Sequence, residues 1–160
     1  MRAGVTVYLL TIAAMIMAFA AGGCCYFAAF VHNELRPYFD QHDMKSYLSQ
    51  AHATLLYLTF SAALLWILYL GTILKVCVDN SEFGFPKLFL MTSGLIVITL
   101  LAMVTKDAWS WWEYFKAAEG LNHLAINCHW LAGVCIANMV TMLVAIVGII
   151  IISILPDLEL

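Results

Sequence analysis

The sequence predicts an all-α integral membrane protein, with four transmembrane helices in a bundle and an amphipathic interfacial helix before the fourth. Of its 160 residues, 64% are hydrophobic and only 11% are charged, whereas soluble domains are about 45–50% apolar and about 25% charged. The apolar residues form four long runs, and none of these has an acidic or basic residue near its middle. Runs of this length satisfy their backbone hydrogen bonds in lipid as helices.

Each apolar run is long enough to cross a hydrocarbon core of about 30 Å, which takes roughly 20 helical residues. One transmembrane domain would cover residues 1–160. Its four expected spans are residues 5–31, 51–76, 88–104 and 130–155. Four crossings would place both ends of the chain on one side of the membrane. Lysine and arginine are divided almost evenly between the two sides, so the orientation and the type of membrane stay open.

Two of the spans carry residues suited to helix packing. Ala14, Ala18 and Gly22 recur every four residues in the first span, and small residues at this spacing let helix backbones approach closely in lipid. The contact could lie within the bundle or against a partner. Asn138 lies well inside the fourth span. An interhelical hydrogen bond from such an amide contributes about 0.6–2 kcal/mol, so we expect it to join helices, with a ligand contact as the alternative.

An aromatic segment precedes the fourth span. Trp109, Trp111 and Trp112 lie among charged residues that recur at helical spacing. This pattern predicts an amphipathic helix in the membrane interface, with the tryptophans as anchors at headgroup depth. A stacking surface for a flat ligand or a partner helix is the alternative.

The sequence also carries a loose internal repeat. The first copy follows span one and the second follows span three, with one residue inserted. The matching residues are Tyr38, Phe39, Asp43, Leu48 and His52 in the first copy, and Tyr114, Phe115, Glu119, Leu124 and His129 in the second. The chain could therefore be two units of helix, connecting segment and helix, as occurs in other membrane proteins.

The five histidines provide the candidate cofactor ligands. All of them fall in the two segments expected on one side of the membrane. His52 and His129 begin spans two and four, and two histidines on different helices of a bundle can ligate a haem b iron. Glu119 and His123 are four residues apart, which on a helix puts both on one face. With His42 they could bind a transition metal, although a solvated polar face explains them more simply.

The cysteines do not form a recognisable redox motif. The chain has five cysteines and no C-x-x-C pair. Four of them lie in or beside apolar runs, where buried free thiols are the expected state. The disulfide state of Cys24, Cys25, Cys128 and Cys135 stays open.

These features favour a non-catalytic function. We expect a small integral membrane accessory or structural subunit that packs into a larger membrane complex, with lipid and other integral subunits as its partners. A haem- or metal-binding redox or oxygenase-type protein is the first alternative, and a transporter of haem or of another small hydrophobic molecule is the second. The spans lack ionisable residues for a proton or ion path. No basic cluster is present that would bind nucleic acid.

Overall fold

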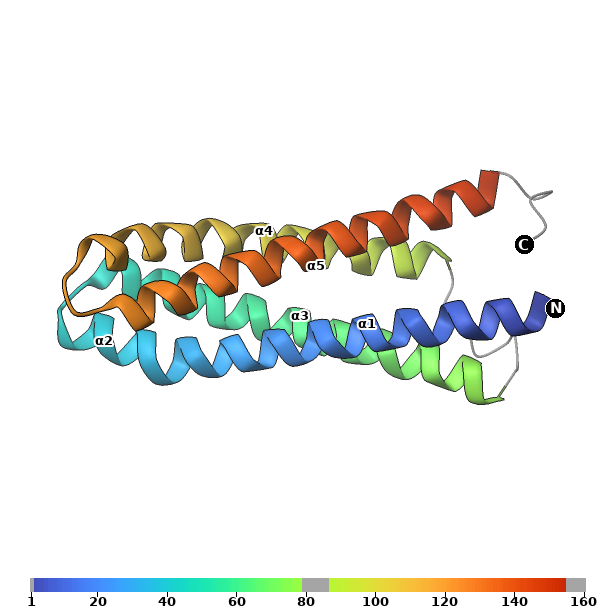
Figure 1. Cartoon of the computed structure of the whole chain (residues 1–160), viewed down its shortest axis with the longest axis horizontal. Coiled ribbons are helices and arrows are strands. Elements are labelled where there is room, and N and C mark those ends of the chain that lie inside the picture. Colours follow the sequence, from blue (N-terminus) through green and yellow to red (C-terminus); the bar gives the residue numbers. More distant parts are fainter. Residues whose placement is uncertain (1, 79–86, 155–160) are drawn as a thin grey trace.

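The computed structural model describes residues 2–78 and 87–154, and its elements are all helical. Four long helices lie side by side along the long axis of the molecule (Figure 1). In chain order the elements are α1 (Arg2–Phe30), the π-helical turn η1 (Val31–Leu35), α2 (Arg36–Gln41), α3 (Lys45–Val78), α4 (Lys87–Ala117) and α5 (Asn122–Ile154).

The four predicted spans are confirmed as helices of membrane-spanning length and apolarity, which indicates a multi-pass membrane protein. The apolar helical stretches are Thr11–Gln41, Lys45–Leu74, Phe89–Ala117 and Asn122–Val147. Residue 155, the expected end of the fourth span, lies outside the described residues.

The helices are longer than the apolar runs that predicted them. Helix α3 begins at Lys45, ahead of the second run, and α4 continues to Ala117, well past the third. An apolar run measures the part of a helix that lies in lipid, whereas polar and aromatic residues can continue the same helix into the interface. The helix expected before the fourth span is therefore not a separate element. Residues 109–115 are the last turns of α4.

The helices associate as two hairpins. The first comprises α1, η1, α2 and α3, and the second comprises α4 and α5. Contacts are extensive within each hairpin, fewer between α3 and α4, and slight between α1 and α5. Helices α1 and α5 diverge toward the termini, whereas the α2–α3 and α4–α5 turns lie together at the opposite end of the molecule (Figure 1). We refer to this as the turn end.

The buried residues recur with alternating spacings of three and four, the seven-residue period of helices that pack side by side. Many of these positions hold small side chains, while large apolar side chains such as Phe19 (80% exposed) and Leu56 (70%) point outward. Lipid solvates large apolar side chains, so small residues can be kept for the helix contacts. The clearest small core positions are Ala14, Ala21 and Cys24 on α1 and Cys128, Ala132 and Cys135 on α5.

Side-chain contacts join the two hairpins at the turn end. The rings of Phe39 and Phe115 stack with centroids 5.9 Å apart and planes 15° apart. Nε1 of Trp111 donates a hydrogen bond to Oε1 of Gln50 at 3.2 Å. Slightly deeper, the Thr54 hydroxyl donates to an Asp107 carboxylate oxygen at 3.0 Å. These contacts between distant parts of the sequence hold α3 against α4.

Several of the buried positions match between the two hairpins, as a repeat would require. The buried residues Ala20, Cys24, Phe27 and Val31 of the first hairpin are each followed 77 positions later by a buried residue of the second: Val97, Leu101, Val104 and Ala108. Further along, the offset is 76 positions, because Leu35 and Phe39 match Trp111 and Phe115. The first hairpin therefore has one extra residue after Val31. It lies in η1, and a π-helical turn is how a helix accommodates one inserted residue.

The offset returns to 77 positions at the turns, so Asp43 matches Gly120 and not Glu119, the match expected from the sequence. Asp43 has a φ of 53° and Gly120 has a φ of 79°, so both turns use a left-handed residue just before the next helix starts. Deeper in the bundle, Ser61 of α3 and Asn138 of α5 are again 77 positions apart. Each has a buried polar side-chain atom without a hydrogen-bond partner among the described residues.

Candidate functional site

The histidines lie at the turn end, and all five are exposed. Two are near the turns themselves: His42 follows α2, and His123 is in the first turn of α5. The ring of His42 stacks on Tyr38, with centroids 4.1 Å apart, and its Nδ1 lies 2.8 Å from the Tyr38 carbonyl oxygen. An imidazole N–H must donate this hydrogen bond.

A polar pocket opens on the outside of the first hairpin. It has a volume of about 520 Å³ and lies between the η1–α2 segment and the start of α3. Its lining contains both hydrogen-bond donors and a carboxylate: His32, Asn33, Arg36, Pro37, Asp40, Leu48 and His52. We call this the η1 pocket. The π-helical turn forms part of its wall, and such turns occur frequently at functional sites.

Hydrogen bonding inside the η1 pocket fixes the roles of two of its side chains. Nη1 of Arg36 lies 2.8 Å from Nδ1 of His32. A guanidinium can only donate, so Nδ1 of His32 accepts, and in the neutral ring the proton lies on Nε2. This bond uses one of the five N–H donors of Arg36. The pocket therefore combines a fixed positive charge and several donors with the Asp40 carboxylate.

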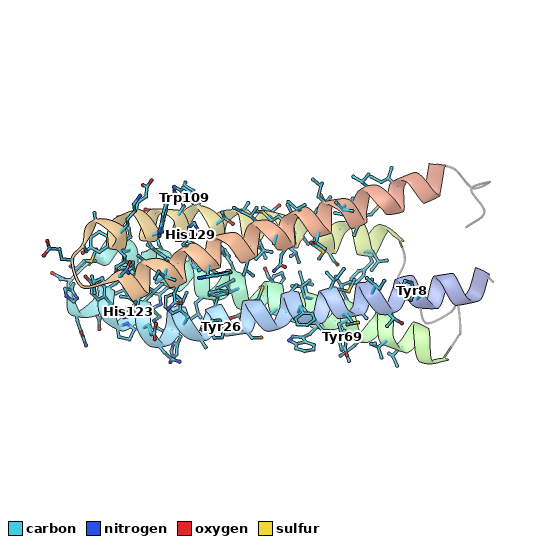
Figure 2. All side chains as sticks on the ribbon, in the orientation of Figure 1. Tyr8, Tyr26, Tyr69, Trp109, His123 and His129 are labelled. Carbon is cyan, nitrogen blue, oxygen red and sulfur yellow. The ribbon has the colours of Figure 1, made fainter. Side chains whose placement is uncertain are left out.

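At the matching place on the second hairpin, the exposed His129 lies beside two tryptophan rings. The His129 ring lies 4.9 Å from Trp112 and 6.5 Å from Trp109, measured between ring centroids. Figure 2 shows His129 and Trp109 near each other on the α4–α5 side of the molecule. The Lys116 ammonium sits 4.8 Å from the centre of the Trp112 ring, within cation–π distance.

The three tryptophans expected as interfacial anchors occupy different environments. Trp111 is fully buried in the bundle core, whereas Trp109 is 44% exposed and Trp112 is half-buried. The predicted apolar face of this segment is present on α4, but Trp111 turns inward against Phe39 of α2 because the helix continues alongside α3.

The structure does not bring the expected haem ligands into one pocket. His52 lines the η1 pocket, whereas His129 lines an apolar groove of about 400 Å³ on α5. Of the expected metal ligands, Glu119 lies in the α4–α5 turn and is exposed, as are His123 and His42. Across residues 2–78 and 87–154, no group of three or more His, Cys, Asp or Glu side chains could hold a metal ion.

The residues expected in helix packing divide between the core and the outer surface. Ala14 is 1% exposed, Ala18 is half-buried, and Gly22 is exposed with nothing within 4 Å of an added Cβ. A helix turns 100° per residue, so positions four apart drift by about 40° per step and leave the buried face within two steps. Asn138 has its amide nitrogen buried without a partner in the described part of the chain.

No protein-family model, curated protein or solved structure matched the chain. The histidine pattern indicated this end of the molecule, but the sequence alone did not group His32, Asn33, Arg36 and Asp40 with His52. One signal was available, because the first four recur on one helical face.

Proposed function

We propose that this chain is a small integral membrane subunit that packs against a transmembrane helix of another protein in a larger complex. The observation that carries the proposal is the apolar groove on α5. It is lined by His129, Trp130, Gly133, Val134 and Ala137.

The groove has the features of a helix-packing surface. Gly133 is exposed, and a Cβ added there would meet nothing within 4 Å, so no contact within the described chain requires a glycine. Gly133 and Ala137 are four residues apart on α5, which places them one turn apart on one face. Such a pair lets a second helix approach closely, and close packing drives association in lipid, where burial of apolar surface contributes little.

The membrane-embedded residues also fit a packing role. Residues 11–31, 53–74, 89–105 and 130–147 contain no aspartate, glutamate, lysine, arginine or histidine. Ion pathways and proton relays through a membrane use such residues. A subunit that contributes helix surface to an assembly does not need them.

The test is purification of the tagged full-length chain from its native membrane in mild detergent, with partner stoichiometry measured by quantitative mass spectrometry. Gly133→Leu fills the groove and should lower the amount of the partner at least about tenfold, as expected when about 1.4 kcal/mol of packing is lost. Ala63→Leu and Ala102→Leu are matched controls, because both place the same side chain at exposed positions on other helices.

The controls should keep the partner at a fixed ratio to the chain. Equal recovery of the partner with Gly133→Leu and with the two controls would contradict the groove as the contact. Recovery of the chain without any stoichiometric membrane partner would contradict the subunit function itself. The paired variant Ala18→Leu, Gly22→Leu tests the exposed side of α1 in the same way.

A further inference from the structure

We propose that the η1 pocket binds the headgroup of a phospholipid that carries both a phosphodiester and an ammonium group. This goes beyond packing into a complex, and it does not depend on it, because the η1 pocket and the α5 groove are lined by different helices.

The internal repeat places aromatic residues in the second hairpin where the first hairpin has polar lining residues. His52 corresponds to His129, 77 positions later, and Arg36 and Asn33 correspond to Trp112 and Trp109, 76 positions later. In the second hairpin the two indoles pack against the histidine. In the first hairpin the corresponding residues are polar and line a cavity of about 520 Å³. The polar character of the cavity therefore follows from the residues at these positions.

The π-helical turn places additional polar groups in the same pocket. Because η1 contains the extra residue, the consecutive residues His32 and Asn33 both line the cavity, together with Arg36. A helix with three such neighbours on one side presents several donors to one ligand. Arg36 is held toward His32 by their 2.8 Å hydrogen bond, so its guanidinium is positioned before a ligand arrives.

The charges of the lining select the ligand chemistry. A guanidinium matches the paired oxygens of a phosphate, and the side chains of His32, Asn33 and His52 can add further hydrogen bonds. Asp40 supplies a single carboxylate on the same lining. It would repel a purely anionic headgroup, whereas it attracts the ammonium of an ethanolamine or choline headgroup. The pocket thus fits a zwitterion.

The position of the pocket along the helices favours a membrane lipid as the source of that headgroup. Its lining residues run from His32 to His52, and the apolar runs end at residue 31 and resume at residue 51. The pocket therefore lies where the hydrocarbon region ends, at headgroup level.

The helix surfaces below the pocket suit an acyl chain. On α1, the exposed residues over the preceding turns are Ala29, Cys25 and Gly22, which are small, and Tyr26, which is 65% exposed. On α3, Leu56 lies one turn into the membrane from His52 and is 70% exposed. Helices α1 and α3 are packed neighbours, so this surface continues downward from the pocket and can accept a lipid tail.

The test begins with the full-length protein reconstituted in vesicles that contain equal amounts of phosphatidylethanolamine and phosphatidylglycerol. The protein is then extracted in mild detergent, and native mass spectrometry measures the lipid that it retains. The wild type should retain one phosphatidylethanolamine per chain in preference to phosphatidylglycerol. Arg36→Leu should reduce retention at least about tenfold, because a charge-assisted contact to phosphate is lost. Asp40→Asn should remove the preference between the two lipids.

Two further variants keep the test falsifiable. Lys45→Leu removes an exposed cation beside the pocket, outside its lining, and should retain lipid as the wild type does. Asn33→Trp with Arg36→Trp introduces the two tryptophans of the second hairpin into the η1 pocket and should exclude the lipid while the thermal unfolding temperature is kept. The proposal is wrong if Arg36→Leu retains as much lipid as the wild type, or if Lys45→Leu loses as much lipid as Arg36→Leu. If soluble phosphoethanolamine, at the same concentration as the lipid, displaces all of the bound lipid, then a lipid is not the specific ligand of the η1 pocket.

Discussion

Truncation of Trp111 tests whether the contacts at the turn end hold the two hairpins together. Trp111 is fully buried, its ring centroid lies 5.9 Å from that of Phe39, and its indole N–H donates to Gln50 of α3 at 3.2 Å. Replacement of a fully buried tryptophan by alanine costs about 3–5 kcal/mol, through lost burial and the cavity left behind. We therefore expect Trp111→Ala to lower the free energy of unfolding by about this amount.

Two further variants separate the parts of this effect. Trp111→Phe keeps an aromatic ring and removes the hydrogen bond, so it should cost less than the alanine variant. A double-mutant cycle that combines it with Gln50→Leu should give a coupling of about 0.6–1.7 kcal/mol, the range for side-chain hydrogen bonds between membrane helices. Trp66→Ala is the control for tryptophan truncation, because Trp66 is 41% exposed on α3, and it should cost about 1 kcal/mol or less.

Buried thiols provide the assay. Cys24 of α1 and Cys128 of α5 are 3% and 0% exposed and are free. Pulsed alkylation in mixed micelles with increasing sodium dodecyl sulfate, read by peptide mass spectrometry, then reports the opening of each hairpin separately. If Trp111→Ala and Trp66→Ala shift the labelling midpoints equally, the turn-end core does not hold the hairpins together and the reasoning fails.

Two more predictions concern backbone positions. A Cβ at Gly94 would lie 2.9 Å from Cδ1 of Ile146, so Gly94→Ala should lower the thermal unfolding temperature in detergent. The added substitution Ile146→Val removes Cδ1 and should restore that temperature. If it does not, this contact is not the cause of the loss. Asp43 and Gly120 both have a positive φ. Gly120→Val should therefore destabilise the folded protein by about 1–2 kcal/mol, whereas Asp43→Gly should be neutral or stabilising. The same unfolding assay checks both variants, and the opposite order of stabilities would contradict the assigned turns.

The sequence was sufficient to predict the four membrane helices, because a long apolar run has few alternatives in lipid. It predicted helix ends poorly. Residues 105–117 are polar enough to leave the membrane yet continue α4, and composition does not say whether such a segment lies flat or stays upright. Hence Trp111 was expected at the interface and is found in the core. Its partners, Gln50 and Phe39, are on the other hairpin, and no local pattern identifies them.

The buried face of each helix was partly available from sequence. In a soluble protein the large apolar residues mark the core, but in lipid they can face outward, so small residues are the better marker. The pattern Ala21, Cys24 on α1 and Cys128, Ala132, Cys135 on α5 follows the buried face. The four-residue ladder from Ala14 to Gly22 instead follows a row that drifts away from it. The spacing of the small residues along the helix therefore identifies the buried face better than their size alone.

The repeat gives the strongest reason to place function on the first hairpin. Both hairpins have a histidine at the same register, and in the described residues the second hairpin packs two tryptophan rings against it. Aromatic contacts of this kind contribute about 0.5–1.5 kcal/mol each. The first hairpin lacks them and instead keeps His32, Arg36 and Asp40 around a cavity. Stability alone would favour the aromatic arrangement in both places. The first hairpin has polar residues in place of the aromatic ones, and they lie next to the π-helical turn. A polar cavity beside such a turn favours a bound ligand.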